Sequence, residues 1–136
     1  MNYAILKTEL ADAKYLAMTN QEVADSLNLP DPAILDTRLV NFRAILAEVT
    51  DGGMVLDAIE TAASASPDIK WALYGIKSDG IDIGHPKTQV QVDALVAGNV
   101  LTSAQGAELK AMAPILSRGQ QLGLGPVSAD QIQVVR

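Results

Sequence analysis

Signals that begin and end helices recur along this chain of 136 residues. Thr19 followed by Glu22 has the pattern of a capping box, in which the hydroxyl accepts from the third amide and the carboxylate reaches back to the cap amide. Ser66 before Pro67 is a second start, because a proline at the first helical position loses no hydrogen bond. A third start lies at residues 102–103. Prolines and glycines between the starts divide the chain into short helices.

The spacing of apolar residues extends these signals into helices. Pro114 lies inside the last of them and is expected to kink or split it near Lys110. The alternation Val90-Gln91-Val92 also permits a short strand. The predicted helices cover residues 2–13, 20–28, 33–49, 54–65, a segment from Ser66 to Ile76, 86–97 and a last segment that starts at Thr102 or Ser103.

The composition suits packed helices. Hydrophobic residues make up 49% of the chain but aromatic residues only 4%, so a core has to be built from Leu, Val, Ile, Ala and Met. Such a core is more typical of helices than of a β-sandwich, and a body of this mass can bury roughly two thirds of its extended surface. We therefore predict a mainly α fold, with residues 1–136 as a single helical domain. This domain is expected to be one compact bundle of about five to seven helices with a glycine-rich C-terminal segment.

The end of the chain is rich in glycine. Gly119, Gly123 and Gly125 are expected to end regular helix. Residues 127–136 are a candidate extended tail, in which residues 131–135 fit either a short strand or a frayed terminal helix.

One apolar series has coiled-coil spacing. Leu35, Leu39, Phe42, Leu46 and Val49 recur at alternating spacings of 4 and 3 residues. We interpret this Leu35–Val49 seam as a stripe for the core or for a dimer.

Charge is distributed unevenly. The chain has 10 basic and 16 acidic side chains, a formal net charge of -6. Residues 1–95 hold 14 acidic and 7 basic side chains, whereas residues 96–136 hold 2 and 3. Residues 96–125 are therefore predicted to form either a buried helix or a surface reserved for a partner. Because the basic residues are scattered, we expect no sequence-specific nucleic-acid binding. Without an apolar run of about 18 residues, we expect no membrane partner.

The sequence offers little material for catalysis. Without cysteine it has no thiolate nucleophile, zinc–thiolate site or iron–sulfur cluster. His85, the single histidine, follows Asp79 and Asp82 in the turn-rich segment 77–86, but these residues complete neither a calcium loop nor a catalytic zinc site. No Gly-x-Ser-x-Gly motif accompanies the histidine. We therefore expect no enzymatic activity, no metal and no cofactor, and interpret residues 77–86 as a solvated turn.

Two of the few aromatic residues lie close together. Trp71 and Tyr74 are three residues apart on one helical face, flanked by Lys70 and Lys77. They fit three roles: anchors of the core, part of a protein interface, or a base-stacking platform. The scarcity of aromatic residues favours the core first and an interface second.

Two stretches of the chain carry a family pattern. The first is Tyr15-Leu16-Ala17-Met18-Thr19, followed by Glu22-Val23-Ala24 and Leu27-Asn28. The second is Leu116-Ser117-Arg118-Gly119, followed by Leu122-Gly123-Leu124-Gly125-x-Val127. Together they resemble the opening and closing patterns of a family of small, mostly uncharacterised tailed-bacteriophage proteins. Gly119 and Gln121 depart from the Ala and Glu expected there. The resemblance implies a phage gene product associated with virion genes, with no catalytic residues.

The expected function is structural. We expect a structural or assembly component of a tailed phage particle, a ring or docking subunit near the neck or tail. Its expected location is the virion, and the host cytoplasm during assembly. The expected partners are other phage structural proteins, through a homo-oligomer or docking on a ring. The alternative is a non-virion phage adaptor or assembly chaperone that uses the acidic N-terminal half to bind another protein.

The expected interface combines several apolar segments. Tyr15, Met18, Leu122 and Leu124 are predicted to be partly exposed and to contact a partner. The glycine-rich end and the Leu35–Val49 seam are expected to supply further contacts.

Overall fold

The structure, a computed structural model, describes residues 1–136 and is mainly helical, with 59% of the residues in helices. Contacts divide the chain into two compact units. Unit 1 consists of Met1–Ile34 together with Ile115–Arg136, and unit 2 consists of Leu35–Pro114. Unit 2 is therefore a continuous segment inserted between the two halves of unit 1, and the chain passes between the units twice.

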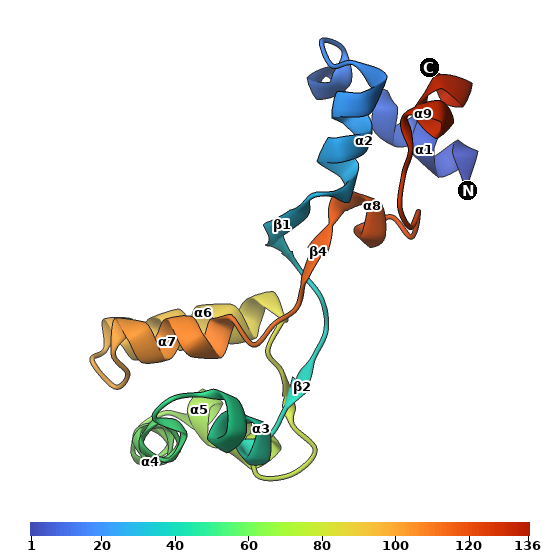
Figure 1. The fold of residues 1–136 in the computed structure, drawn as a ribbon. Helices are drawn as coiled ribbons and strands as arrows, with labels where there is room; N and C mark the ends of the chain where they lie inside the picture. Colours follow the sequence, from blue (N-terminus) through green and yellow to red (C-terminus); the bar gives the residue numbers. More distant parts are fainter. The chain divides into compact units, whose positions relative to one another are not determined.

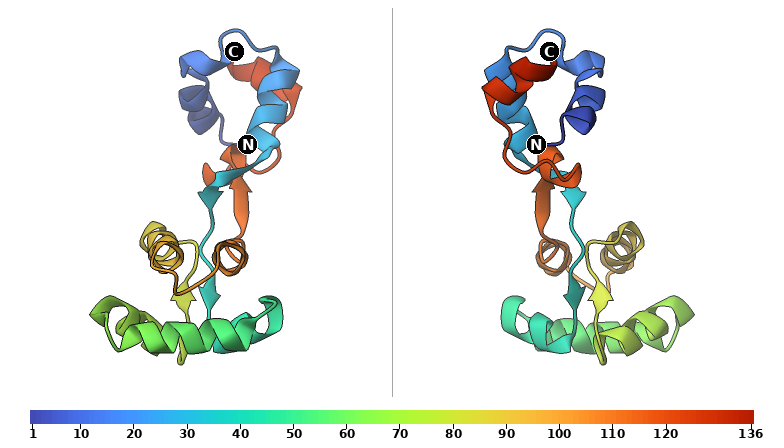
Figure 2. Two further views of the ribbon diagram at one scale, coloured as in Figure 1. Left: turned by 90° about the vertical axis from the view of Figure 1, so that its left-hand side faces the viewer. Right: turned by 90° about the vertical axis from the view of Figure 1, so that its right-hand side faces the viewer.

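Unit 1 brings the two ends of the chain into one helical body. Helix α9 packs against α1 and α2, and α8 packs against α2 (Figures 1 and 2). Strands β1 and β4 form a two-stranded sheet. The elements are α1 (Tyr3–Leu10), a 3-10 turn (Ala13–Tyr15), α2 (Asn20–Asn28), β1 (Pro30–Leu35, whose last residue belongs to unit 2), β4 (Ile115–Ser117), α8 (Arg118–Gln121) and α9 (Ala129–Val135).

The core of unit 1 comes from both ends of the sequence. Its buried residues are Leu6, Tyr15, Val23, Ala24, Leu27, Leu124, Val127 and Ile132. Val23, Ala24 and Leu27 form the inner stripe of α2, as their helical spacing predicts.

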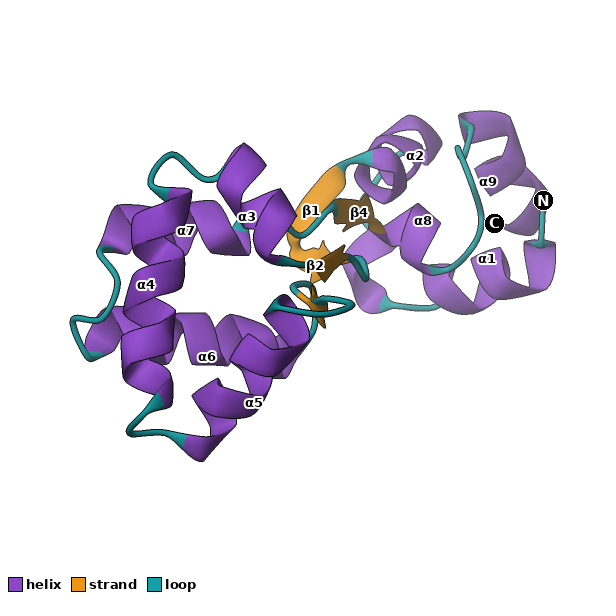
Figure 3. Cartoon of the chain, turned by 90° about the horizontal axis from the view of Figure 1, so that it is seen from below, coloured by secondary structure: helices purple, strands orange, loops and turns teal.

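Unit 2 consists of helices around its own core. Helix α4 packs against α3 and α5, and α6 packs against α7 (Figure 3). Strands β2 and β3 pair in antiparallel register, with Leu39 opposite Asp82 and Val40 opposite Ile81. The elements are β2 (Leu39–Val40), α3 (Phe42–Glu48), α4 (Gly52–Ala63), α5 (Pro67–Ile76), β3 (Ile81–Asp82), α6 (Pro86–Ala97) and α7 (Ser103–Lys110).

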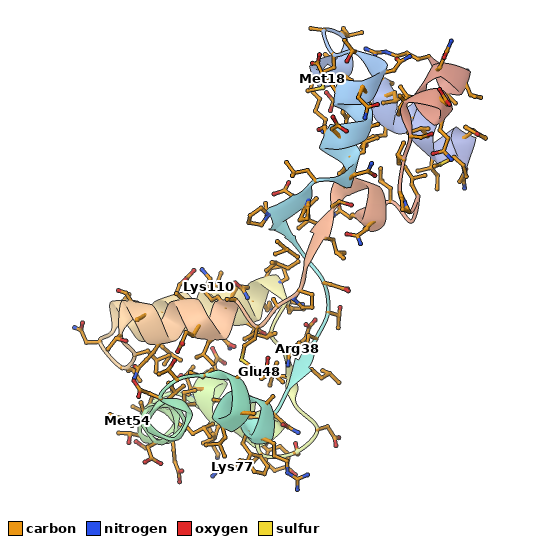
Figure 4. The ribbon with its side chains drawn as sticks, in the orientation of Figure 1. Met18, Arg38, Glu48, Met54, Lys77 and Lys110 are labelled. Atoms are coloured by element: carbon orange, nitrogen blue, oxygen red, sulfur yellow. The ribbon has the colours of Figure 1, made fainter.

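Polar contacts fix the edges of unit 2. Arg38, just before β2, pairs with Glu48 at the end of α3 and donates to the carbonyl of Met112 at 3.0 Å (Figure 4). Lys110 pairs with Asp93 at 2.8 Å and so links the end of α7 to α6. These side chains are partly exposed, so the contacts orient the elements more than they stabilise them.

The predicted helix starts are largely confirmed. Thr19 caps α2 and accepts from the amide of Glu22 at 3.2 Å, but the predicted capping box is incomplete, since the Glu22 carboxylate accepts from the Thr19 hydroxyl and not from its backbone amide. Ser66 caps α5, and Thr102 caps α7 in a complete capping box. Helix α6 begins at Pro86 and ends at Ala97, as predicted, so the alternative strand at residues 90–92 is absent.

The predicted helix over residues 33–49 is confirmed only in its second half, as α3 (Phe42–Glu48), and is wrong before Phe42. Residues 30–35 form β1, and α3 begins only at Phe42. The backbone before Pro32 is held extended. Asn41 then sets the true helix start, since its side-chain oxygen accepts from the amides of Arg43 and Ala44 at 3.1 and 3.2 Å.

The Leu35–Val49 seam is consequently not a continuous helical stripe. Leu39 in β2 and Leu46 in α3 are exposed, whereas Val49 is buried. A heptad spacing has structural meaning only within one helix, and here it crosses a strand, a cap and a short helix.

The C-terminal predictions also need correction. The helical alternative for residues 131–135 is confirmed, because they lie in α9, where Ile132 is completely buried in the core of unit 1; the last ten residues form neither an extended tail nor a strand. The glycine-rich terminal segment is not confirmed either. Gly123 and Gly125 are left-handed turn positions, with φ of 72° and 68°, between α8 and α9. Helix α7 ends at Lys110, which is where Pro114 was expected to break it.

Two hydrophobic cores take the place of the single bundle core that the sequence predicts. The buried residues of unit 2 lie between Val40 and Ala113, and none of them belongs to the core of unit 1. That residues 1–136 fold as a single domain stays a prediction, since separate cores can still unfold together. No helix combines the length and apolar character that crossing a bilayer requires.

Candidate interaction surfaces

The two stretches that carry the family resemblance meet in unit 1. Asn28, the last residue of α2, reaches the loop before α9, almost one hundred positions along the chain. Its side-chain amide donates to the carbonyl of Val127 at 2.7 Å, and its side-chain oxygen accepts from the Val127 amide at 2.8 Å. Both polar groups of one side chain thereby clamp the closing stretch onto the opening one.

A partly buried ionic network is the second link between these stretches. Arg118 at the start of α8 donates to both carboxylate oxygens of Glu9, at 3.0 and 2.8 Å. The hydroxyl of Tyr15 donates to the same carboxylate at 2.8 Å. The Glu9 side chain is only 9% exposed, so its charge depends on these partners.

The network shifts the ionisation of its members. Hydrogen bonding from Arg118 is the largest cause that lowers the pKa of Glu9, from 4.5 to about 2, with a smaller contribution from Tyr15. Burial, followed by its bond to Glu9, raises the pKa of Tyr15. Glu9 is therefore ionised and Tyr15 protonated throughout the physiological range, which indicates a fixed structural contact and not an acid–base pair.

Two of the four predicted interface residues are not exposed. Tyr15 is 2% exposed and Leu124 is 7% exposed, because both belong to the core of unit 1. Met18 and Leu122 lie at the edge of this core and are partly exposed, as predicted. The interface role of the set stays a prediction, which the structure limits to Met18 and Leu122.

The departure at Gly119 has a structural reason. A Cβ atom on this residue would lie 2.9 Å from the backbone oxygen of Leu27. Here α8 approaches the end of α2 closely, and only glycine fits without a shift of backbone.

The most exposed aromatic residues of the chain lie on α5. Trp71 is 66% exposed and Tyr74 is 68% exposed, so the prediction that they anchor the core is wrong. Their ring centroids are 6.1 Å apart in an edge-to-face arrangement. Monomeric proteins rarely expose large aromatic side chains together, and Trp and Tyr are enriched at the centres of protein interfaces. The interface and base-stacking roles remain.

Cations border this aromatic pair. The ammonium group of Lys70 lies 5.7 Å from the centroid of the Trp71 ring. The Nζ atom of Lys77 lies 3.8 Å from a carboxylate oxygen of Glu60 in α4, and both side chains are more than half exposed. We call Lys70, Trp71, Tyr74 and Lys77 the α5 patch.

The loop around His85 serves the local fold. The Nδ1 atom of His85 accepts from the amide of Lys87 at 3.1 Å and so caps α6. Asp82 accepts from the amides of Arg38 and Gly84, at 3.1 and 3.0 Å. No group of three or more His, Asp and Glu side chains has a metal-binding arrangement. The loop thus contains the short strand β3 and a helix cap in place of a wholly solvated turn.

Unit 2 contains a small apolar cavity. It measures about 40 Å³, and its lining includes Ile69 and Ile76 of α5 together with Val92 and Leu95 of α6. Small-molecule sites usually measure about 300 Å³ or more. The cavity therefore has no room for a cofactor of ordinary size.

The charge-poor segment 96–125 is buried in part, and a partner surface there stays a prediction. Leu101, Leu109 and Met112 are buried in unit 2, whereas Ala104 and Ala107 on the outer side of α7 are exposed.

No protein-family model, curated protein or solved structure matches this chain.

Proposed function

We propose that this chain is a structural or assembly component of a tailed bacteriophage particle. Its role is that of a ring or docking subunit near the neck or tail, present in the virion and, during assembly, in the host cytoplasm. It acts by binding other phage structural proteins, including further copies of itself, and performs no catalysis.

One observation carries the proposal. The two stretches that resemble a phage protein family lie about one hundred positions apart in the sequence, and they form one folded unit through Asn28, Arg118 and their partners. This meeting supports the family assignment and, with it, association with virion genes.

The exposed side chains of α5 support the mode of action. Trp71 and Tyr74 project from the exposed side of α5, whereas Ile69, Leu73 and Ile76 form its buried face. When a helix exposes large apolar side chains opposite its buried face, these side chains typically bind another protein.

The proposal is tested by the composition of the particle. Particles of the phage that encodes this chain are purified by density gradient, and their proteins are identified by quantitative mass spectrometry. We expect this polypeptide at a constant ratio to the tail or neck proteins. Its presence only in infected-cell lysate, bound to another protein, would instead establish the adaptor or assembly chaperone and refute the structural role.

A further inference from the structure

The exposed side of α4 carries a stripe that contrasts chemically with the α5 patch. Met54, Asp57 and Thr61 are spaced three and four residues apart and lie on one face of the helix. We call these three residues the α4 stripe. Met54 is 68% exposed, and Asp57 takes part in none of the ion pairs of the chain. A Cβ atom on the neighbouring Gly53 would meet no other atom within 4 Å, so the surface is open there.

The α5 patch has the complementary groups. Its two rings are suitable partners for the thioether of Met54, since sulfur–aromatic contacts are favourable. Lys70 has no ion-pair partner in the chain and is free to meet a carboxylate such as that of Asp57. The α5 patch has an aromatic centre and a charged rim, which is the usual arrangement of a protein interface.

We infer that the α5 patch of one copy binds the α4 stripe of a second copy of this chain. Both surfaces belong to unit 2, so every copy supplies one of each. Met54 and Lys77 lie at separate places on the outside of this unit (Figure 4). A contact between two different surfaces is heterologous, and it repeats from copy to copy until a ring closes or a filament forms.

The inference deepens the proposed function and rests on it for the role of the contact in a particle. A ring subunit needs a heterologous contact of this kind. The contact itself depends only on the chemistry of α4 and α5, so it can be tested on the purified chain.

Phosphate-bearing partners fit the α5 patch less well. A base-stacking platform or a membrane surface would also use Trp, Tyr and Lys. However, the rim of the patch includes two carboxylates, Glu60 beside Lys77 and the exposed Asp68 in the first turn of α5. These two carboxylates balance Lys70 and Lys77, so the patch lacks the excess positive charge that binding to a phosphate backbone requires, whereas the α4 stripe carries a single carboxylate and meets the rings through Met54.

The test is sedimentation equilibrium of the full-length chain and of two variants, each of which removes one surface. The first is Trp71→Ala with Tyr74→Ala, and the second is Met54→Ala with Asp57→Lys. We expect the wild-type mass to exceed the 14.3 kDa of the monomer and to rise with concentration. Each variant should weaken this association by about tenfold or more. All four side chains are exposed, so the variants should keep the wild-type circular dichroism.

Mixing the two variants distinguishes this contact from non-specific association. The first variant keeps an intact α4 stripe and the second an intact α5 patch, so an equimolar mixture should form a complex of two chains and grow no further. The matched control is Val90→Ala on α6, which removes a side chain of similar exposure outside both surfaces and should change nothing.

Several results would overturn the inference. These are a wild-type chain that stays monomeric up to about 100 µM, ten times a Kd of about 10 µM, variants that associate like the wild type, or a mixture that remains monomeric. Loss of binding to oligo-dT or to anionic vesicles in the first variant, without self-association of the wild type, would assign the patch to phosphates instead. A monomeric chain that is nevertheless found in particles refutes this inference alone, whereas a self-associating chain absent from particles refutes only the proposed function.

Discussion

At the scale of single residues, unit 1 depends on a few polar side chains that join the ends of the sequence. Glu9 is the most sensitive of them, because its carboxylate is nearly buried and is held by Arg118 and Tyr15. The sequence did not reveal this network, since nothing in the spacing of residues 9, 15 and 118 marks them as neighbours.

The ionisation of Glu9 predicts a specific loss of stability in acid. Its pKa is lowered on folding from 4.5 to about 2, so the ionised form stabilises the fold above pH 4.5 and this contribution disappears as the pH falls toward 2. We expect Glu9→Gln to lower the free energy of unfolding by about 2 kcal/mol at pH 7 and by much less near pH 2. Urea unfolding at a series of pH values measures this difference. A difference that does not depend on pH would contradict the assignment.

Asn28 makes a second residue-scale prediction. Asn28→Ala removes both hydrogen bonds to Val127, and we expect it to lower the free energy of unfolding by about 1–3 kcal/mol. Gln133→Ala on the exposed side of α9 is the control and should change stability by less than about 0.5 kcal/mol. Thermal unfolding of the wild type and the two variants measures these changes in stability. Equal effects of the two substitutions would mean that the contact of Asn28 with Val127 does not stabilise the fold.

At the scale of elements, the structure depends on close backbone approaches as well as on helix caps. Among the glycines of the two stretches that carry the family resemblance, only Gly119 lies this close to another part of the backbone, where α8 meets the end of α2.

Gly119→Ala tests this approach. The added Cβ would lie 2.9 Å from the oxygen of Leu27, so we expect a loss of about 1–3 kcal/mol of stability. Gly53→Ala in α4 is the matched control, because the space there is open and alanine is the better helix former, by about 0.5–1 kcal/mol. Denaturant unfolding should therefore show effects of opposite sign. A neutral Gly119→Ala would show that α8 can move away from α2.

The sequence predicts elements well where local chemistry decides them. Thr19, Ser66 and Thr102 identify true helix starts, because a cap is a contact between residues that are close in sequence. The prediction fails at residues 33–41, where proline and the Asn41 cap override an apolar spacing that looks helical. Trp71 and Tyr74 are misplaced for another reason: α5 is apolar on almost every side, so its periodicity does not identify the buried face.

At the scale of the whole molecule, the chain has two cores and a discontinuous unit 1. Unit 2 is built from one continuous segment, whereas unit 1 requires both ends of the chain to meet. Pairings between distant segments cannot be read from local patterns, which is why the sequence predicts one bundle.

Hydrogen exchange tests whether these units respond separately. Ile132→Ala opens a cavity in the core of unit 1, and we expect faster amide exchange in α1, α2 and α9 with little change in α4 to α7. Leu73→Ala in unit 2 is the reciprocal substitution. Equal acceleration in both units after either substitution would show one cooperative domain, as predicted from the sequence.

We propose that this chain acts by binding neighbours within a phage particle, through side chains that its own fold leaves exposed. A reconstruction of the assembled particle at side-chain resolution is the most direct test. We expect copies of the chain near the neck or tail, with Trp71 and Tyr74 buried against an adjoining subunit. A particle without the chain, or one in which the α5 patch faces solvent in every copy, would contradict the account.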